Sequence, residues 1–293
     1  PVPGMITILI ANLLNALLNW AFVFGHLGFP ALGAEGSAMA TSITRLAMAA
    51  MLIGYVLWTP DLARYGVRSR LAGGWKAIWS AGAKARQMGY ASGASYGLEA
   101  AAFGSMSLFA GWLGVLDLAG WSIALNAMSM VFMTAVGLGV GTAVRVGHAH
   151  GRGDRHEMAV AGWVGLGATA FAMGVASLGF LFLSHPLALV FSSDPALVAM
   201  AAAMLTMASW VMIADGRQGM MLSAVRATGD TWIPTLMHFT SYFGVMIPLA
   251  WALAFPLKLG AAGLFLGILG ASVVAVGLLS WRFHQRTAAA MPA

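Results

Sequence analysis

Long apolar runs, each about the length needed to cross a bilayer, dominate this chain of 293 residues. Hydrophobic residues make up 60% of it and charged residues only 8%, whereas soluble domains carry about 25% charged residues. Such a chain has too little polar surface to cover a water-soluble globule. About 20 consecutive apolar residues span the hydrocarbon core as an α-helix. We therefore predict an all-α, polytopic membrane protein with eight transmembrane helices, at residues 3–25, 37–58, 85–112, 119–143, 159–184, 195–225, 233–255 and 261–282.

Basic residues alternate from loop to loop along the chain. They follow the even-numbered helices and comprise Arg64, Arg68, Arg70, Lys76, Lys84, Arg86, Arg145, Arg152, Arg155, Arg226, Arg282 and Arg286. In the loops on the other side, Lys258 is the only Lys or Arg. Because positive residues mark the cytoplasmic side, we expect a multi-pass membrane protein with a cytoplasmic C-terminus. This placement also accounts for the net charge of +6 without a nucleic-acid partner.

Two links on the outer side resemble each other and indicate an internal repeat. Residues 29–36 read Phe-Pro-Ala-Leu-Gly-Ala-Glu-Gly, and residues 255–263 read Phe-Pro-Leu-Lys-Leu-Gly-Ala-Ala-Gly. The helix before each link opens with a proline, Pro3 in one case and Pro234 in the other. Parallel repeats of this kind build one class of secondary transporter.

Two acids lie inside apolar stretches that otherwise lack charge. Glu99 is the only charged residue in 87–116, and no charged residue precedes Asp215 within 195–214. A carboxylate at membrane depth is costly, so it usually binds a proton, a cation or a cationic ligand. The alternatives are a neutral helix–helix contact for Glu99 and an interfacial position for Asp215. We favour the functional reading for both acids.

Other polar residues are candidates for a cavity or for a polar network between helices. Gln218 lies three residues after the second acid, on the same helix face. Asn12, Asn15 and Asn19 fall on one face of the first helix, where interhelical hydrogen bonds are favoured over substrate contacts. Asn126 is a similar case. The chain has no cysteine, no phosphate-binding loop and no nucleophile–base pattern. We therefore expect no enzyme, no cofactor and no metal beyond Na⁺ at the two acids.

Three motifs, taken in order, resemble the multidrug and toxic compound extrusion (MATE) transporters. The run from Gly25 to Thr41 resembles the junction of their fifth and sixth helices. Residues 143–154, which contain Gly-Arg-Gly-Asp, are similar to the loop after their eighth helix. Residues 224–231 with Pro234 are similar to a Leu-Arg-Gly-x-Gly-Asp-Thr-x-x-Pro signature. The resemblance covers the whole chain and identifies it as helices five to twelve of twelve.

The resemblance implies two six-helix lobes that enclose a cavity and rock between inward- and outward-facing states. Organic cations or other amphiphiles then leave the cell in exchange for Na⁺ or H⁺. In the NorM-like branch the coupling acids are a Glu in helix seven and an Asp in helix ten, which are the positions of Glu99 and Asp215. Some Na⁺-linked relatives have a Tyr where this chain has Val211, so Na⁺ and H⁺ both stay open.

The resemblance also implies a division of the chain. Residues 1–60 are the last two helices of the N-terminal lobe, 61–84 a cytoplasmic linker, 85–286 a six-helix C-terminal lobe and 287–293 a cytoplasmic tail. Four further helices are expected in the whole protein.

The two acids and the resemblance together predict a secondary antiporter in the lipid bilayer of a bacterial inner membrane that exports organic cations, drugs or other amphiphilic xenobiotics. The alternative is a flippase of related fold for lipid-linked saccharides or peptidoglycan precursors. Such a flippase needs cavity cations to hold phosphates, and Arg45 and Arg217 are the candidates. The acids are the better-placed charges, which favours the antiporter.

Overall fold

The computed structural model describes residues 2–59 and 79–288. These residues fold into helices and connecting turns, with no strand among them. The chain divides into two compact units between Ala85 and Arg86. Most of the expected linker 61–84 lies outside the described residues, as do residues 289–293 of the expected tail.

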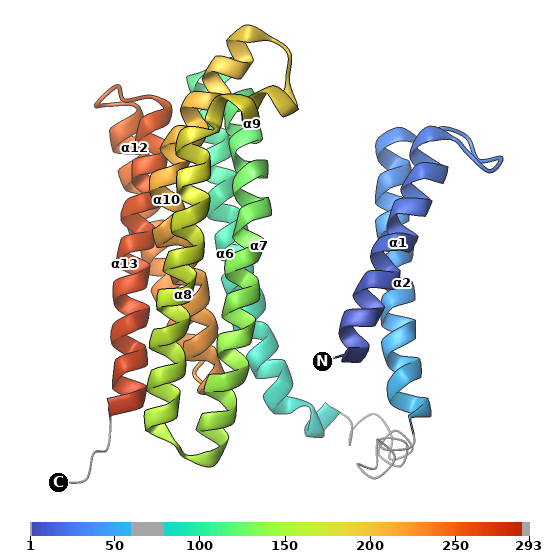
Figure 1. Ribbon diagram of the computed structural model, residues 1–293, viewed down its shortest axis with the longest axis vertical. Helices are drawn as coiled ribbons and strands as arrows, with labels where there is room; N and C mark the ends of the chain where they lie inside the picture. The colour runs from blue at the N-terminus through green and yellow to red at the C-terminus, as the bar shows by residue number, and fades with distance from the viewer. Residues whose placement is uncertain (1, 60–78, 289–293) are drawn as a thin grey trace. The chain divides into compact units, whose positions relative to one another are not determined.

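The first unit contains a helical hairpin, α1 (Val2–Phe24) and α2 (Gly33–Trp58), whose helices run antiparallel (Figure 1). Ala21 and Phe22 of α1 form a small core with Ala40 of α2. Ala40 is fully buried, so its small side chain lets the two helices approach closely.

The second unit is a bundle in which consecutive long helices run antiparallel (Figure 1). It consists of α6 (Ala83–Leu113), α7 (Val115–Arg152), α8 (Arg155–Phe182), α9 (Ser184–Phe191), α10 (Pro195–Ala227), α11 (Trp232–Phe239), η1 (Thr240–Met246), α12 (Ile247–Ala254) and α13 (Ala261–Ala288). Helix α10 packs against α7, α8 and α13 and carries many of the buried residues. The turns after α7 and α10 lie at the same end of this unit as the last turns of α13 (Figure 1).

The prediction of an all-α, polytopic membrane protein is confirmed. In the described part of the chain, seven helical segments are long and apolar enough to cross a membrane, and they correspond to seven of the predicted spans. The remaining one, α6, has the length to cross at 31 residues but is less apolar. Its Gly and Ser residues and Glu99 explain the difference.

Three elements differ from the prediction. The helix expected at 119–143 runs as α7 to Arg152, so Arg145 lies on a helix and not in a loop. The loop expected at 185–194 contains the short helix α9, whose Ala188 is buried. The span expected at 233–255 is interrupted by the π-helical segment η1. Pro248 follows this segment and lacks an N–H for the α-helical ladder, which favours the wider turn before it.

The two similar links fold alike, in line with an internal repeat. Gly33 and Gly260 occupy equivalent positions and have φ values of 53° and 56°, in the left-handed region that favours glycine. Three residues later, Gly36 and Gly263 lie directly against the backbone of the preceding helix. An added Cβ would lie 2.6 Å from the oxygen of Phe22 at Gly36, and 2.4 Å from the nitrogen of Ala254 at Gly263.

The Gly-Arg-Gly-Asp motif forms the tight turn between α7 and α8. Gly153 ends α7 in the left-handed conformation, with φ of 73°. The Asp154 side chain then caps α8 by accepting a hydrogen bond of 2.8 Å from the backbone N–H of Glu157. The motif is thus a helix stop followed by a helix start.

Small residues hold α10 against α7 and α8 in the middle of the bundle. A Cβ on Gly216 would lie 2.4 Å from Cγ of Met173 and 3.3 Å from Cβ of Ala135, so only glycine fits without rearrangement. Asp215 is the neighbouring residue on α10. The same close packing therefore fixes the position of that acid.

Candidate functional site

A cavity of about 550 Å³ lies within the second unit, among α6, α7, α10, α11 and η1. Both predicted acids line it, Glu99 from α6 and Asp215 from α10. Much of the remaining wall is apolar and includes Phe103, Phe132 and Met212. The cavity thus combines an adaptable apolar wall with a few charged groups, which is the usual make-up of a small-molecule site.

Asp215 belongs to a buried hydrogen-bond network. Its Oδ1 accepts hydrogen bonds from Nε2 of Gln218, at 2.8 Å, and from Oγ of Ser272 on α13, at 3.3 Å. Gln218 also donates to the hydroxyl of Tyr242, at 3.0 Å. Asp215 is buried about three turns before the end of α10, so it is not a residue of the helix end. Gln218 lies on the face of Asp215, as the spacing indicated.

Tyr242 reaches this network from the π-helical segment. Its side chain is fully buried, and its ring makes edge contacts with Phe103, at a centroid distance of 6.4 Å, and with His238, at 5.1 Å. A π-turn shifts the phase of a helix and often occurs at functional sites. Here η1 is the element that directs Tyr242 toward Gln218.

Glu99 lies on α6 between two residues that contact the α11–η1 region. One turn before it, Oγ of Ser95 lies 3.4 Å from Nδ1 of His238. One turn after it, Phe103 packs on Tyr242. Glu99 is half-buried and has no hydrogen bond or ion pair with any residue that the structure describes.

Arg226 lines the cavity, which the sequence analysis did not predict. It was expected in a cytoplasmic loop, but it lies in the last turn of α10 and lines the same cavity as the acids. Its Nε and Nη2 atoms are buried and have no partner among the described residues. The two cations expected for a flippase are placed differently, because Arg217 is not part of the cavity wall and Arg45 belongs to the first unit.

Asn126 lies on α7 but outside the cavity wall. Its neighbours Leu125 and Met128 line the cavity, whereas Asn126 is exposed and donates a hydrogen bond of 2.9 Å to the backbone oxygen of Ser122.

The three asparagines of α1 belong to the first unit. Nδ2 of Asn15 donates to Oγ1 of Thr44 on α2, at 3.3 Å, which is the interhelical contact that the spacing favoured. Asn19 donates to the backbone and side-chain oxygens of Asn15. Asn12 is exposed.

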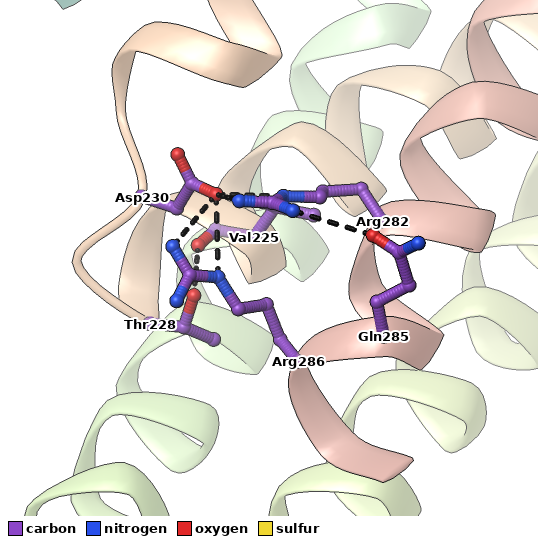
Figure 2. A network of polar contacts seen from close by, with 6 residues as sticks. All are labelled: Val225, Thr228, Asp230, Arg282, Gln285 and Arg286. Carbon is purple, nitrogen blue, oxygen red and sulfur yellow. Dashed lines mark hydrogen bonds and ion pairs between the residues drawn. The ribbon is translucent and has the colours of Figure 1, made fainter. Parts of the chain in front are cut away.

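The turn after α10 is fixed to α13 by a charged cluster, shown in Figure 2. Oδ2 of Asp230 accepts from Nε of Arg282, at 2.8 Å, and from Nη2 of Arg286, at 2.9 Å, while Arg282 also donates to Gln285. Burial by itself would raise the pKa of Asp230, but the hydrogen bonds and charges of the two arginines hold that pKa below its ordinary value. This cluster anchors the end of α10 that carries Arg226.

The cavity has oxygen atoms that could act as cation ligands. Within residues 2–59 and 79–288, no three His, Asp or Glu side chains gather into a metal-binding group. The carboxylates of Glu99 and Asp215 share the cavity with the hydroxyl of Tyr242. Such hard oxygen ligands suit a small hard cation.

Comparisons with known proteins agree with this architecture. A family model described as MatE matches residues 92–252. A protein named "Probable multidrug resistance protein NorM" from Caulobacter vibrioides is 37% identical over 290 residues, which cover 97% of this chain and 60% of that protein. A protein of the same name from Mesorhizobium japonicum is 32% identical over 302 residues, covering 99% and 63%.

Solved structures share the fold. The crystal structure of the eukaryotic MATE transporter AtDTX14 matches with a TM-score of 0.81 at 19% identity, over 97% of this chain and 63% of that one. A transporter of the MOP superfamily from Pyrococcus furiosus matches with a TM-score of 0.81 at 16% identity, over 97% and 62%. The chain spans about three-fifths of the length of the relatives it matches. The family model covers more than half of the chain, and the chain therefore belongs to the MatE family, as its motifs predicted.

Proposed function

We propose that the whole gene product is a secondary antiporter that exports organic cations, drugs or other amphiphilic xenobiotics in exchange for Na⁺ or H⁺. The observation that carries this proposal is that Glu99 and Asp215, from different helices, line one largely apolar cavity. Relatives named as multidrug resistance proteins and MATE transporters support the class of activity.

In this proposal the two acids bind the coupling cation, and drug and cation compete or alternate at them. Glu99 has no described partner and is the more accessible acid, whereas Asp215 is held by Gln218 and Ser272. A ligand shifts a conformational equilibrium only through its different affinity for the two states. Binding of a proton or Na⁺ at these carboxylates supplies such a difference between the inward- and outward-facing states.

The proposed setting is the inner membrane of a bacterium with the C-terminus in the cytoplasm. Within the second unit, the turns after α7 and α10 and the last turns of α13 share one end (Figure 1). This end carries Arg152, Arg155, Arg282 and Arg286, which supports its assignment to the cytoplasmic side.

A second candidate keeps the fold and changes the cargo to a lipid-linked saccharide or peptidoglycan precursor. The observation in its favour is Arg226, a cavity-lining cation with unpartnered nitrogens that could hold a phosphate. The two acids in the same cavity would repel such a polyanion, so the exporter remains our proposal.

The test is Glu99→Gln in the whole gene product, with ethidium efflux measured in energised cells and expression measured by immunoblot. We expect efflux to fall to the background of cells that lack the transporter, because the amide cannot exchange a proton or bind Na⁺ as a carboxylate does. Glu35→Gln is the matched control, since Glu35 is an exposed residue in the first turn of α2. Normal efflux by Glu99→Gln at equal expression would sink the assignment.

A further inference from the structure

A second cavity of about 550 Å³ lies between α7 and α8 and has no lining residue in common with the cavity of the two acids. Gly137 and Gly141 of α7 line it, and a Cβ added at either would meet no neighbouring atom within 4 Å. Beside this open space the two helices cross closely, because a Cβ added at Gly165 of α8 would lie 2.3 Å from Oγ1 of Thr142. The second cavity is therefore a groove next to a tight helix crossing.

The walls of this groove are mainly apolar. Leu138 lines it from α7, and Val160 and Val164 line it from α8, where the side chain of Val164 is 62% exposed. Both helices are long and apolar enough to cross a membrane. Because each residue of an α-helix rises about 1.5 Å, the groove extends about 12 Å along α7 from Gly137 to Arg145. That length suits the first part of one extended hydrocarbon chain.

Thr142 presents an unused hydroxyl to the groove. The residue lines the groove and is only 7% exposed, yet it forms no hydrogen bond with any residue in the ranges 2–59 and 79–288. Other buried threonines, such as Thr44 and Thr235, donate to the backbone oxygen four residues earlier. A buried hydroxyl without a partner is costly and rarely found. An acceptor that occupies the groove would satisfy this hydroxyl.

Arg145 gives the groove an unpaired positive charge. It follows Thr142 by three residues, so the two side chains lie on one face of α7. Arg145 is exposed, and no carboxylate pairs with it in the part of the chain that the structure describes. Glu157 also lines the groove, but its carboxylate pairs with Arg152, which lies outside. The charge that remains for a ligand is therefore positive, and a guanidinium matches the oxygens of a phosphate.

We propose that this groove binds an anionic glycerophospholipid of the surrounding bilayer. Arg145 holds the phosphate, the hydroxyl of Thr142 donates to a phosphate or ester oxygen, and one acyl chain lies over Gly137 and Gly141. Arg145 and Thr142 are about 4.5 Å apart along the helix axis, so both reach the polar part of one lipid. A soluble anion would leave the apolar length of the groove unused, whereas a phospholipid fills both parts. The site is independent of the proposed export function.

Photolabelling with a lipid probe tests the proposal on the whole gene product in phosphatidylcholine proteoliposomes. The probe is phosphatidylglycerol with a diazirine in one acyl chain, and peptide mass spectrometry locates the labelled residues. We expect labelling of groove residues on α7 and α8, which unlabelled phosphatidylglycerol should reduce. Arg145→Gln should lower this labelling about fivefold, the effect of one basic residue on an anionic lipid. Arg155→Gln is the control, because Arg155 is exposed at the same end of the bundle but lies outside the groove.

A second pair of variants tests the apolar part of the groove. Gly141→Leu places a side chain in the open space and should abolish groove labelling. Gly167→Leu is its control, because a Cβ there also meets nothing within 4 Å and Gly167 does not line the groove.

Three results would overturn the proposal. Equal groove labelling by a phosphatidylcholine probe would show that Arg145 does not select an anionic lipid. Unchanged labelling in Arg145→Gln and Gly141→Leu would show that the probe does not occupy the groove. Absence of label from the groove in wild-type protein would show that another part of the gene product covers it.

Discussion

Asp230→Asn should destabilise the second unit by removing the charge at the centre of the cluster in Figure 2. The carboxylate is almost fully buried, and a single oxygen accepts from two guanidinium groups. Arg282 is largely covered, with 19% of its side chain exposed, whereas Arg286 is 43% exposed. The interaction of Asp230 with Arg282 should therefore contribute most of the loss of stability.

The magnitude follows from these exposures. A hydrogen bond to a charged group contributes about 1.5–3 kcal/mol, whereas an exposed ion pair contributes about 0–1 kcal/mol. The amide of Asn retains an acceptor, so part of the first contribution survives. We expect the free energy of unfolding to fall by about 2 kcal/mol.

The assay is denaturant unfolding of the whole gene product in detergent micelles, followed by tryptophan fluorescence. Asp117→Asn is the matched control, because Asp117 lies in the first turn of α7 and makes no described hydrogen bond. The pKa of Asp230 is lower in the folded protein than in the unfolded chain, so its stabilisation is present above the ordinary pKa of about 3.9 and is lost as the pH falls through the folded value. A difference between Asp230→Asn and wild type below 0.5 kcal/mol, or one that persists after acidification, would refute the reasoning (the threshold is about the limit for surface substitutions).

Two further substitutions test the packing and the polar network. Gly165→Val should lower the free energy of unfolding by about 1–3 kcal/mol, because an added Cβ would lie 2.3 Å from Oγ1 of Thr142. Gly167→Val is the control and should lower it by less than about 1 kcal/mol, because an added Cβ there meets nothing within 4 Å. Equal costs in chemical denaturation would contradict the tight crossing of α7 and α8. Tyr242→Phe removes the hydroxyl that accepts from Gln218 and should lower ethidium efflux several-fold without changing expression, since Asp215 loses a support of its network. Wild-type efflux would show that the network is not needed.

The fold was predictable where its signals are local. Apolar runs located the spans, whereas the extension of α7 to Arg152 and the start of α8 at Arg155 were not predicted, although Gly153 followed by Asp154 is a local signal for a helix end and a helix start. The break in the span at 233–255 was harder to foresee, because Pro248 signals a disturbance but not its form. Helix α9 has only eight residues, and most of them are apolar, so its sequence shows no helical alternation of polar and apolar residues that would mark it as a helix.

The candidate site was predictable only in part. Glu99 and Asp215 stand out because charge is rare in their surroundings, and the structure brings both to one cavity. Whether they bind the coupling cation stays a prediction. Tyr242 and Ser272 carry no comparable signal, since hydroxyls are common in membrane helices and only tertiary packing selects these two. Arg226 was assigned to a loop because the sequence does not show that α10 continues to Ala227.

The central claim is that Glu99 and Asp215 together couple substrate export to a cation gradient. The most direct measurement is uptake of labelled ethidium into proteoliposomes of the whole gene product under an imposed Na⁺ or pH gradient. We predict that wild-type protein accumulates substrate in response to one of these gradients, whereas the double variant Glu99→Gln/Asp215→Asn shows no gradient-driven accumulation. Accumulation by the double variant at the wild-type level would contradict the account.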